Sequence, residues 1–425
     1  MYKIYKEISY PVVLIFLLLL YGCYTSNVAV KNKNLHYIYN PGQTQIHPQA
    51  YIYHPNDSQT TVFIKVPGNQ LLFESKIPNA SPEAGFQVRY QLLESFKSNQ
   101  VLDSGLYEYS FNEDYKNKEI IVDITINAKD TANYVLNLLV TDINRKKGNQ
   151  MLLFINKTDK NHTQNYLVTD KLDNNPVFNY FVYPGQAVNI KCNDDVSELF
   201  VDHIDDNFPL PNPPFSADIT KKYKITTDTA FIYKCSANSE IVIDKEGLYR
   251  IRKDTSYKSG LVLYNFGKYY PDVKTPGEML KSLRYLTTSR EFEQYQMFKD
   301  KKEAVDNFWV NTGNINRARE LIRIYYNREK YANLFFTSFT QGWKTDRGMI
   351  YLVFGPPSII YKDDFGETWI YGSNINMQTM KFRFNKINNP LTDNDFELQR
   401  SSIYKIIWYE AVDSWRNGRA FSIMK

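Results

Sequence analysis

The sequence predicts a multidomain protein in which two β-sandwich modules precede a C-terminal α+β domain. Three observations lead to this prediction. Apolar and polar residues alternate with a period of two in many segments between about residues 50 and 272. At Thr275 the period changes to that of a helix. The length of 425 residues also exceeds that of one ordinary domain and suggests two or three.

The N-terminal residues have the pattern of a bacterial export signal. An unbroken apolar run, Val12–Leu20, follows two lysines and is too short to span a bilayer core of about 30 Å. The next residues, ending in Gly22-Cys23, resemble the lipobox of bacterial lipoproteins. The resemblance implies a signal peptide over residues 1–22 and acylation of Cys23. The alternative is an ordinary secretory signal with an incidental cysteine.

Acylation would anchor the protein at a membrane, because each buried CH₂ contributes about 0.8 kcal/mol. Residues 24–31 contain no acidic residue, so they carry neither an inner-membrane retention signal nor an acidic surface-export signal. We therefore expect the anchor in the periplasmic leaflet of the outer membrane. Residues 23–49 are rich in Asn and Lys and are expected to form a tether that holds the folded part away from the membrane.

Two β-rich segments follow the tether. Alternation in residues 86–92, 120–126 and 134–140 predicts antiparallel strands with one buried face, so residues 50–160 are expected to form an immunoglobulin-like sandwich. Residues 161–273 are expected to form a second β-rich module. The proline-rich run 208–215 cannot join a sheet and is expected to be a rigid connector, with a docking surface as the alternative.

Charge and cysteine content limit the partners and the chemistry. Lys and Arg number 51 against 46 Asp and Glu, and no basic tract is present, so nucleic acid is not an expected partner. After Cys23 only Cys192 and Cys235 remain. In an oxidising compartment they could form one disulfide, and two separate buried thiols are the alternative.

From Thr275 the sequence predicts helices, then strands, then a final helix, over a domain of residues 274–425. Capping-box spacings at Thr275–Glu278 and Thr288–Glu291 open two helices, and Asn314 opens a third. Strands are expected at residues 368–371 and 379–384. The last helix is expected to end at Gly418.

The stretch from Gln341 to Ile360, QGWKTDRGMIYLVFGPPSII, combines turn formers with an apolar run. We expect a tight turn at Thr345–Gly348, in which the Asp346 carboxylate accepts the Gly348 N–H. Met349–Phe354 is expected to be a strand buried on both faces, which Gly355-Pro356-Pro357 ends.

Two large side chains of this stretch are expected to be buried. Trp343 is expected to fill a core against the apolar run. A buried Arg347 needs a carboxylate, and Glu367 is the nearest candidate in the sequence.

This region resembles the GWxTD domain family of Bacteroidota envelope proteins over roughly Thr275 to Lys425. Arg328–Phe336 is similar to the run that precedes the family motif, and Ser358 stands where an acidic residue is common. The family has no assigned reaction, so the resemblance implies a structural or interaction role for the motif. The residues that carry it are Gly342, Trp343, Thr345, Asp346, Arg347, Gly348, Gly355, Pro356, Pro357, Glu367 and Trp369.

Few reactive side chains lie in the domain that carries the motif. All five His and all three Cys precede Thr275, which excludes a Cys–His pair or a His/Cys zinc site within it. His203 lies among three Asp in residues 202–206, a cluster that could bind a cation but is expected to be a solvated loop. Asp346, Asp363, Asp364 and Glu367 lie close in the sequence, and two of these carboxylates could serve glycoside hydrolysis if one had a raised pKa and their separation were suitable. We expect no catalytic residue, cofactor or metal.

The favoured function is a non-catalytic, lipid-anchored interaction or scaffold protein of the periplasm and outer membrane. It would belong to an envelope assembly such as a secretion, export or barrel complex, and the β modules would space the last domain from the membrane. The alternative is a glycan- or peptidoglycan-binding or -hydrolysing protein, in which Trp343, Trp369, Trp408 and the many Tyr could stack on sugar rings. The two hypotheses differ in whether these Trp rings line a cleft or a core.

Overall fold

The computed structural model describes residues 30, 33–75, 77–78, 80–129, 131–193, 196–217, 225–235, 240–372 and 379–422. The predicted signal peptide and Cys23 lie outside the described residues. Within the described part, no helix combines the length and the apolar character needed to cross a membrane.

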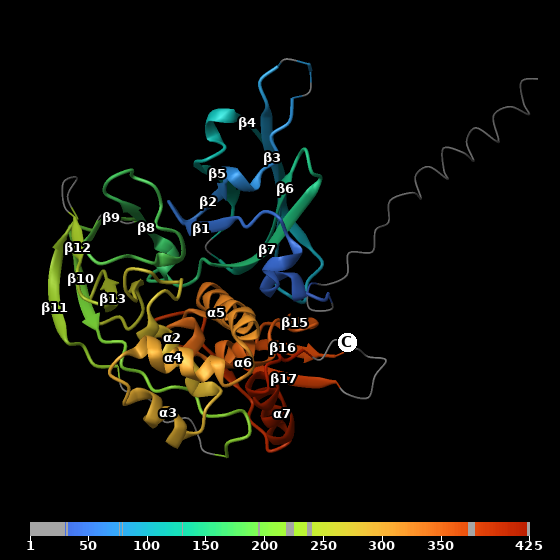
Figure 1. Ribbon diagram of the computed structural model, residues 1–425. Coiled ribbons are helices and arrows are strands. Elements are labelled where there is room, and N and C mark those ends of the chain that lie inside the picture. The colour runs from blue at the N-terminus through green and yellow to red at the C-terminus, as the bar shows by residue number, and fades with distance from the viewer. Residues whose placement is uncertain are drawn as a thin grey trace, which may run out of the picture.

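The first β module consists of two antiparallel sheets that enclose one core (Figure 1). The three-stranded sheet has the order β1-β2-β5, and the four-stranded sheet has the order β4-β3-β6-β7. Alternate residues of the long strands point inward, as the period of two predicted. The strands are β1 (Gln49–Tyr53), β2 (Gln59–Pro67), β3 (Glu83–Leu93), β4 (Val101–Asn112), β5 (Glu119–Asn127), β6 (Asn133–Asp142) and β7 (Lys147–Asn156).

The second β module also has two antiparallel sheets, in the orders β12-β9-β8 and β11-β10-β13-β14. It packs on the first module, because the Tyr51 hydroxyl donates to the Tyr166 carbonyl at 2.9 Å and accepts the Val168 N–H at 3.0 Å. The prediction of several β-sheets followed by a helical region is confirmed. The strands are β8 (Tyr166–Asp170), β9 (Gln186–Cys192), β10 (Glu198–Ile204), β11 (Thr229–Lys234), β12 (Ile241–Ile243), β13 (Gly247–Arg252) and β14 (Leu261–Asn265).

The possible disulfide between Cys192 and Cys235 is not formed. Cys192 ends β9 and Cys235 follows β11, so the two side chains approach each other from different sheets. A hydrogen bond between the two thiols takes the place of the covalent bond. Burial raises the pKa of the Cys235 thiol, and the hydrogen bond with Cys192 opposes this rise.

The C-terminal domain places its helices around a four-stranded antiparallel sheet of order β15-β16-β17-β18 (Figure 1). Both predicted capping boxes are present, and Asn314 caps the third predicted helix. The helices are α2 (Pro276–Ser282), α3 (Ser289–Gln296), α4 (Lys301–Val310), α5 (Ile315–Phe336), α6 (Asp346–Phe354) and α7 (Tyr404–Arg416). The strands are β15 (Ile359–Asp363), β16 (Gly366–Tyr371), β17 (Met380–Lys386) and β18 (Phe396–Leu398).

The prediction of a strand at Met349–Phe354 is wrong, because this run forms most of helix α6. The Thr345 side chain accepts the Gly348 N–H at 3.0 Å as the helix N-cap, a role that was assigned to Asp346. All nine residues of α6 are buried. A helix buried on every side shows no periodicity that separates it from a buried strand.

The prediction of a free tether over residues 23–49 is wrong for the part that the structure describes from residue 33. Leu35 and Tyr39 are buried in the core of the C-terminal domain. The Leu35 N–H donates to the Ile360 carbonyl on β15 at 2.8 Å, and Asn34 exchanges hydrogen bonds with Ser358 and Ile360. Figure 1 shows this segment, in dark blue, next to β15. We call residues 34–40 the clasp.

Candidate functional site

The glycines of the motif permit close backbone packing around the 3₁₀ turn η9 (Gly342–Lys344). A Cβ on Gly342 would lie 2.1 Å from the Ala332 carbonyl oxygen of α5. A Cβ on Gly348 would lie 2.0 Å from the Gly342 carbonyl oxygen. Only glycine fits at both positions. Gly342 allows η9 to contact α5, and Gly348 allows α6 to contact η9.

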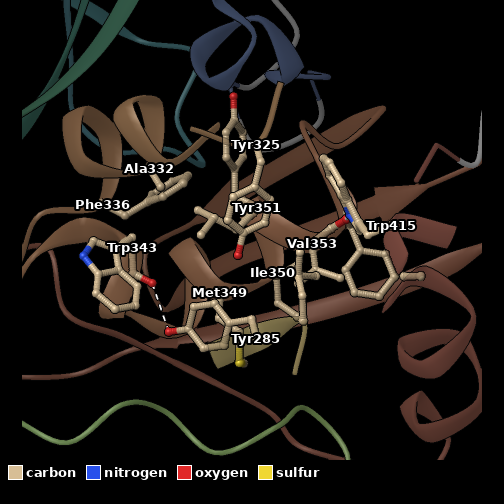
Figure 2. Packing of buried hydrophobic residues seen from close by; sticks show 14 of the residues in the cluster. Tyr285, Tyr325, Ala332, Phe336, Trp343, Met349, Ile350, Tyr351, Val353 and Trp415 are labelled. Atoms are coloured by element: carbon tan, nitrogen blue, oxygen red, sulfur yellow. Dashed lines mark hydrogen bonds between the residues drawn. The ribbon is translucent and has the colours of Figure 1, made fainter. Parts of the chain in front are cut away.

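Trp343 belongs to the core. Its backbone N–H donates to Asn333 Oδ1 at 3.1 Å, and its indole N–H donates to Gln341 Oε1 at 2.8 Å. Figure 2 shows its ring among the core side chains and its carbonyl accepting the Tyr285 hydroxyl, a bond of 3.1 Å. All five tryptophans are buried. The predicted stacking surface of Trp343, Trp369 and Trp408 is therefore absent.

Asp346 connects the motif to the chain beyond β18. Its carboxylate accepts the Leu398 N–H at 2.7 Å and forms a buried ion pair with Arg400. Burial raises the pKa of Asp346, and the Arg400 guanidinium opposes this rise. Arg400 also donates to the Asn212 carbonyl at 3.0 Å, so one carboxylate organises a contact with the proline-rich run of the second β module.

Arg347 lies at the centre of a second charge cluster. It donates to Glu367 Oε1 at 3.0 Å, and both side chains are 1% exposed, which confirms the predicted pairing. Glu367 also accepts bonds from Lys362 at 2.9 Å, the Tyr39 hydroxyl at 2.8 Å and the Trp369 indole at 2.9 Å. Burial alone would raise the pKa of Glu367, but the Lys362 and Arg347 cations outweigh it and hold that pKa at about 2.

Gly355 and the two prolines end α6. Gly355 has a φ of +83°, and a Cβ there would lie 2.8 Å from the Arg328 guanidinium. Arg328 donates to the Leu352 and Val353 carbonyls at 3.1 and 3.2 Å, where α6 leaves carbonyls without helical partners. Pro356 and Pro357 then lead to β15. The sequence analysis did not predict that Arg328 caps the end of α6, because this role depends on a contact with a helix that it did not expect.

The C-terminal domain thus receives two segments from earlier in the chain. One is the clasp, whose Tyr39 carbonyl accepts the Tyr351 hydroxyl at 2.9 Å. The other is residues 208–215, which we call the strap. Its Phe215 ring lies 5.4 Å from that of Tyr409, and its Pro214 carbonyl accepts the Ser401 N–H at 3.0 Å. The strap docks within its own chain and is more than a connector between strands.

Two hollows lie beside these contacts. A cleft of about 800 Å³ lies where both β modules meet the C-terminal domain, and a hydrogen bond between His162 and Asp393 crosses it. Its walls carry mainly amide, hydroxyl and apolar groups, and the Ser259 hydroxyl there donates to the Asp159 carboxylate at 3.5 Å. A groove of about 490 Å³ lies between the strap and α7. Next to it, α7 and the residue before it expose Ile403, Ile406 and Tyr409 at 70%, 73% and 49%.

The predicted cluster of His203 and three Asp is divided by the fold. Asp202 pairs with Arg250 and Arg252 at 2.8 and 2.6 Å. Asp206 pairs with Lys344 at 2.8 Å, on the C-terminal domain. His203 and Asp205 stay together.

A residue far along the chain joins the remaining pair. Asp228 lies beside His203 and Asp205, although 22 residues separate it from Asp206 along the chain. The sequence analysis did not include Asp228, because no pattern in the sequence indicates that its strand pairs with that of His203.

The fold and the motif geometry define a class: a β-rich multidomain protein whose last domain is an α+β unit organised by buried charges. Residues 247–417 match the family model of the GWxTD domain, and the chain therefore carries a GWxTD domain. No curated protein matches the chain. Among solved structures, the crystal structure of CBD12 from CALX1.2 matches 57% of this chain and 89% of its own, at 10% identity and a TM-score of 0.14.

Proposed function

We propose that the protein is a lipid-anchored, non-catalytic interaction subunit of a bacterial envelope assembly. It would be attached through Cys23 to the outer membrane and face the periplasm, with immunoglobulin-like β modules and no bound cofactor required for this role. The observation that carries the proposal is the environment of the motif's charged residues: Asp346, Arg347 and Glu367 are buried and paired within the chain, and their bonds hold the strap and the clasp.

A hydrolytic role would need a carboxyl group that substrate can reach. Asp346 and Glu367 are 8% and 1% exposed, and each is paired with a cation. A carboxylate held at a pKa of about 2 by two cations is a poor general base or acid near neutral pH. The burial of the tryptophans likewise removes the Trp surface on which the glycan hypothesis partly depended.

The clasp changes the expected orientation at the membrane. Eleven residue steps separate Cys23 from Asn34, which is bonded to β15. An extended chain spans at most about 3.3–3.6 Å per residue, so the anchor would lie within about 40 Å of β15. The GWxTD domain would therefore stay close to the membrane, and the expectation that the β modules space it away is replaced.

The surface best suited to a protein partner is the exposed apolar side of α7. Ile403, Ile406 and Tyr409 recur every three residues, and Tyr409 lines the groove under the strap. Exposed apolar groups next to a concave surface are typical of protein interfaces. We propose that an apolar segment of an envelope protein binds there.

The test is site-specific photo-crosslinking in cells. A photoreactive residue at Ile406 is expected to capture one stoichiometric set of envelope proteins. The same residue at Leu172, which is 96% exposed in the second β module, is the matched control and should capture none of them. Ile403→Asp should reduce capture from position 406 without unfolding the protein.

Equal capture from both positions would refute the assigned surface. Recovery of peptidoglycan or polysaccharide fragments alone would refute the interaction role and favour a glycan ligand.

A further inference from the structure

His203, Asp205 and Asp228 meet at one end of the second β module. His203 is the second-last residue of β10, and Asp205 directly follows that strand. Asp228 precedes β11, and its N–H donates to the His203 carbonyl at 2.9 Å. His203 Nδ1 lies 3.5 Å from Asp228 Oδ2 and 4.0 Å from Asp205 Oδ1. One donor atom from each residue fits within a span of 4.8 Å.

The surroundings of the imidazole direct Nδ1 toward the two carboxylates. Nε2 lies 3.0 Å from the Glu246 carbonyl, which can only accept, so Nε2 carries a hydrogen. His203 is 1% exposed, and no hydrogen bond in the described part of the chain satisfies Nδ1. Gly247 leaves room for the ring, since a Cβ there would lie 2.6 Å from Nε2. A histidine whose other nitrogen donates to a carbonyl is the usual arrangement of a metal ligand.

The donor set and its spacing fit a small transition-metal cation. Zinc binds imidazole and carboxylate at about 2.0–2.2 Å, so tetrahedral ligand atoms lie roughly 3.3–3.6 Å apart. The 3.5 and 4.0 Å from His203 Nδ1 would need a contraction of about half an ångström or less, and the three donor atoms, which now span up to 4.8 Å, would have to close by about 1 Å at the widest pair. One nitrogen and two oxygens suit zinc, whereas calcium takes six to eight oxygen ligands.

Lys245 now neutralises the same carboxylates. Its ammonium lies 3.1 Å from Asp205 Oδ1 and is hydrogen-bonded to Asp228 Oδ2. The Lys245 side chain is 53% exposed, so it can move into solvent with little loss of packing. We propose that His203, Asp205 and Asp228 bind one divalent transition-metal cation of the zinc type, which replaces the Lys245 ammonium.

The bound ion would hold the chain in one conformation where the second β module continues into the strap. It would join the end of β10 to the start of β11, three residues before the strap begins at Phe208. Asp206, between the site and the strap, bonds Thr340 at 2.7 Å in the GWxTD domain. A metal here would therefore stabilise the join between the two parts without taking part in a reaction.

The test is isothermal titration of the chelator-treated full-length protein with zinc chloride in a non-coordinating buffer. We expect one site per chain. Asp228→Asn should weaken the site at least tenfold, and it can be made safely because Asp228 is solvent-exposed. Lys245→Met should strengthen binding several-fold, since it removes the competing ammonium. Asp254→Asn, a change of an exposed carboxylate in the same module, is the matched control and should leave binding unchanged.

A second readout uses cobalt, whose visible absorption bands report imidazole and carboxylate coordination. These bands should appear with the native protein and be lost in the Asp228→Asn protein. Absence of binding at millimolar zinc would overturn the proposal, as would binding that Asp228→Asn leaves intact. A Lys245→Met protein with unchanged affinity would also overturn it, because the ammonium would then not compete with the ion.

Discussion

Replacing Glu367 by Gln tests whether the motif's charge cluster stabilises the GWxTD domain. The glutamine keeps the shape but removes the negative charge that Arg347 and Lys362 share. Two cations would then remain at a site where Arg347 is 1% exposed. Breaking a buried ion pair in this way costs about 3–5 kcal/mol of unfolding free energy, because one partner is left uncompensated.

The pH dependence of stability gives a second value for the contribution of Glu367 to the free energy of unfolding. The folded-state pKa of Glu367 is about 2, below its ordinary value of 4.5. The stabilisation is therefore fully present above pH 4.5 and is lost as the pH falls toward 2. At about 1.4 kcal/mol per pKa unit, the difference corresponds to roughly 3 kcal/mol, which agrees with the cost of the substitution.

Urea denaturation at pH 7, 5 and 3 measures both effects. The Glu367→Gln protein should be less stable at pH 7 and should lose less further stability on acidification than the native protein. Glu320→Gln is the control, because Glu320 pairs with Arg317 at the surface and should change stability by less than about 1 kcal/mol. A Glu367→Gln protein within 1 kcal/mol of the native protein at pH 7 would refute the argument.

Three further predictions follow from the same core. Burial raises the pKa of Glu329 to about 8, so the native protein should lose up to about 5 kcal/mol between pH 4.5 and 8, and Glu329→Gln should abolish this loss in denaturation curves. Gly342→Ala should lower the free energy of unfolding by about 3 kcal/mol or more, because the added Cβ would clash with the α5 backbone. Gly277→Ala is the control, because open space surrounds Gly277, and it should change the free energy of unfolding by less than about 1 kcal/mol. Thermal melting compares the two proteins. Tyr39→Phe removes a hydrogen bond to Glu367, so limited proteolysis should cleave the clasp sooner; an unchanged rate would contradict its role.

Local signals predicted local structure well. A capping box needs only two residues three positions apart, so Thr275 and Thr288 could be placed at helix starts from sequence alone. The alternation of the long strands identified their buried faces for the same reason. The pairing of Arg347 with Glu367 was predictable because a buried guanidinium needs a carboxylate and few were near.

The failures share a different cause. Residues 23–49 are rich in Asn and Lys, yet two residues of the clasp, Leu35 and Tyr39, are deeply buried and contact partners more than 300 positions away. The acidic run was divided because neighbouring strand residues point to opposite faces, which sends Asp202 and His203 in different directions. No pattern in the sequence of either segment reports which distant strand will lie beside it.

The correction of α6 from strand to helix changes what the motif explains. The sequence analysis placed Asp346 and Arg347 in a tight turn before the strand, whereas the structure places them in the first turn of α6. At the start of a helix, adjacent residues diverge by about 100° around the axis, so Asp346 reaches Arg400 and the strap while Arg347 reaches Glu367 and the clasp. The glycines hold α6 close enough to α5 for both contacts to form. The motif residues described above thus pack or pair within the fold, and a search for activity should turn to the exposed surfaces of the protein.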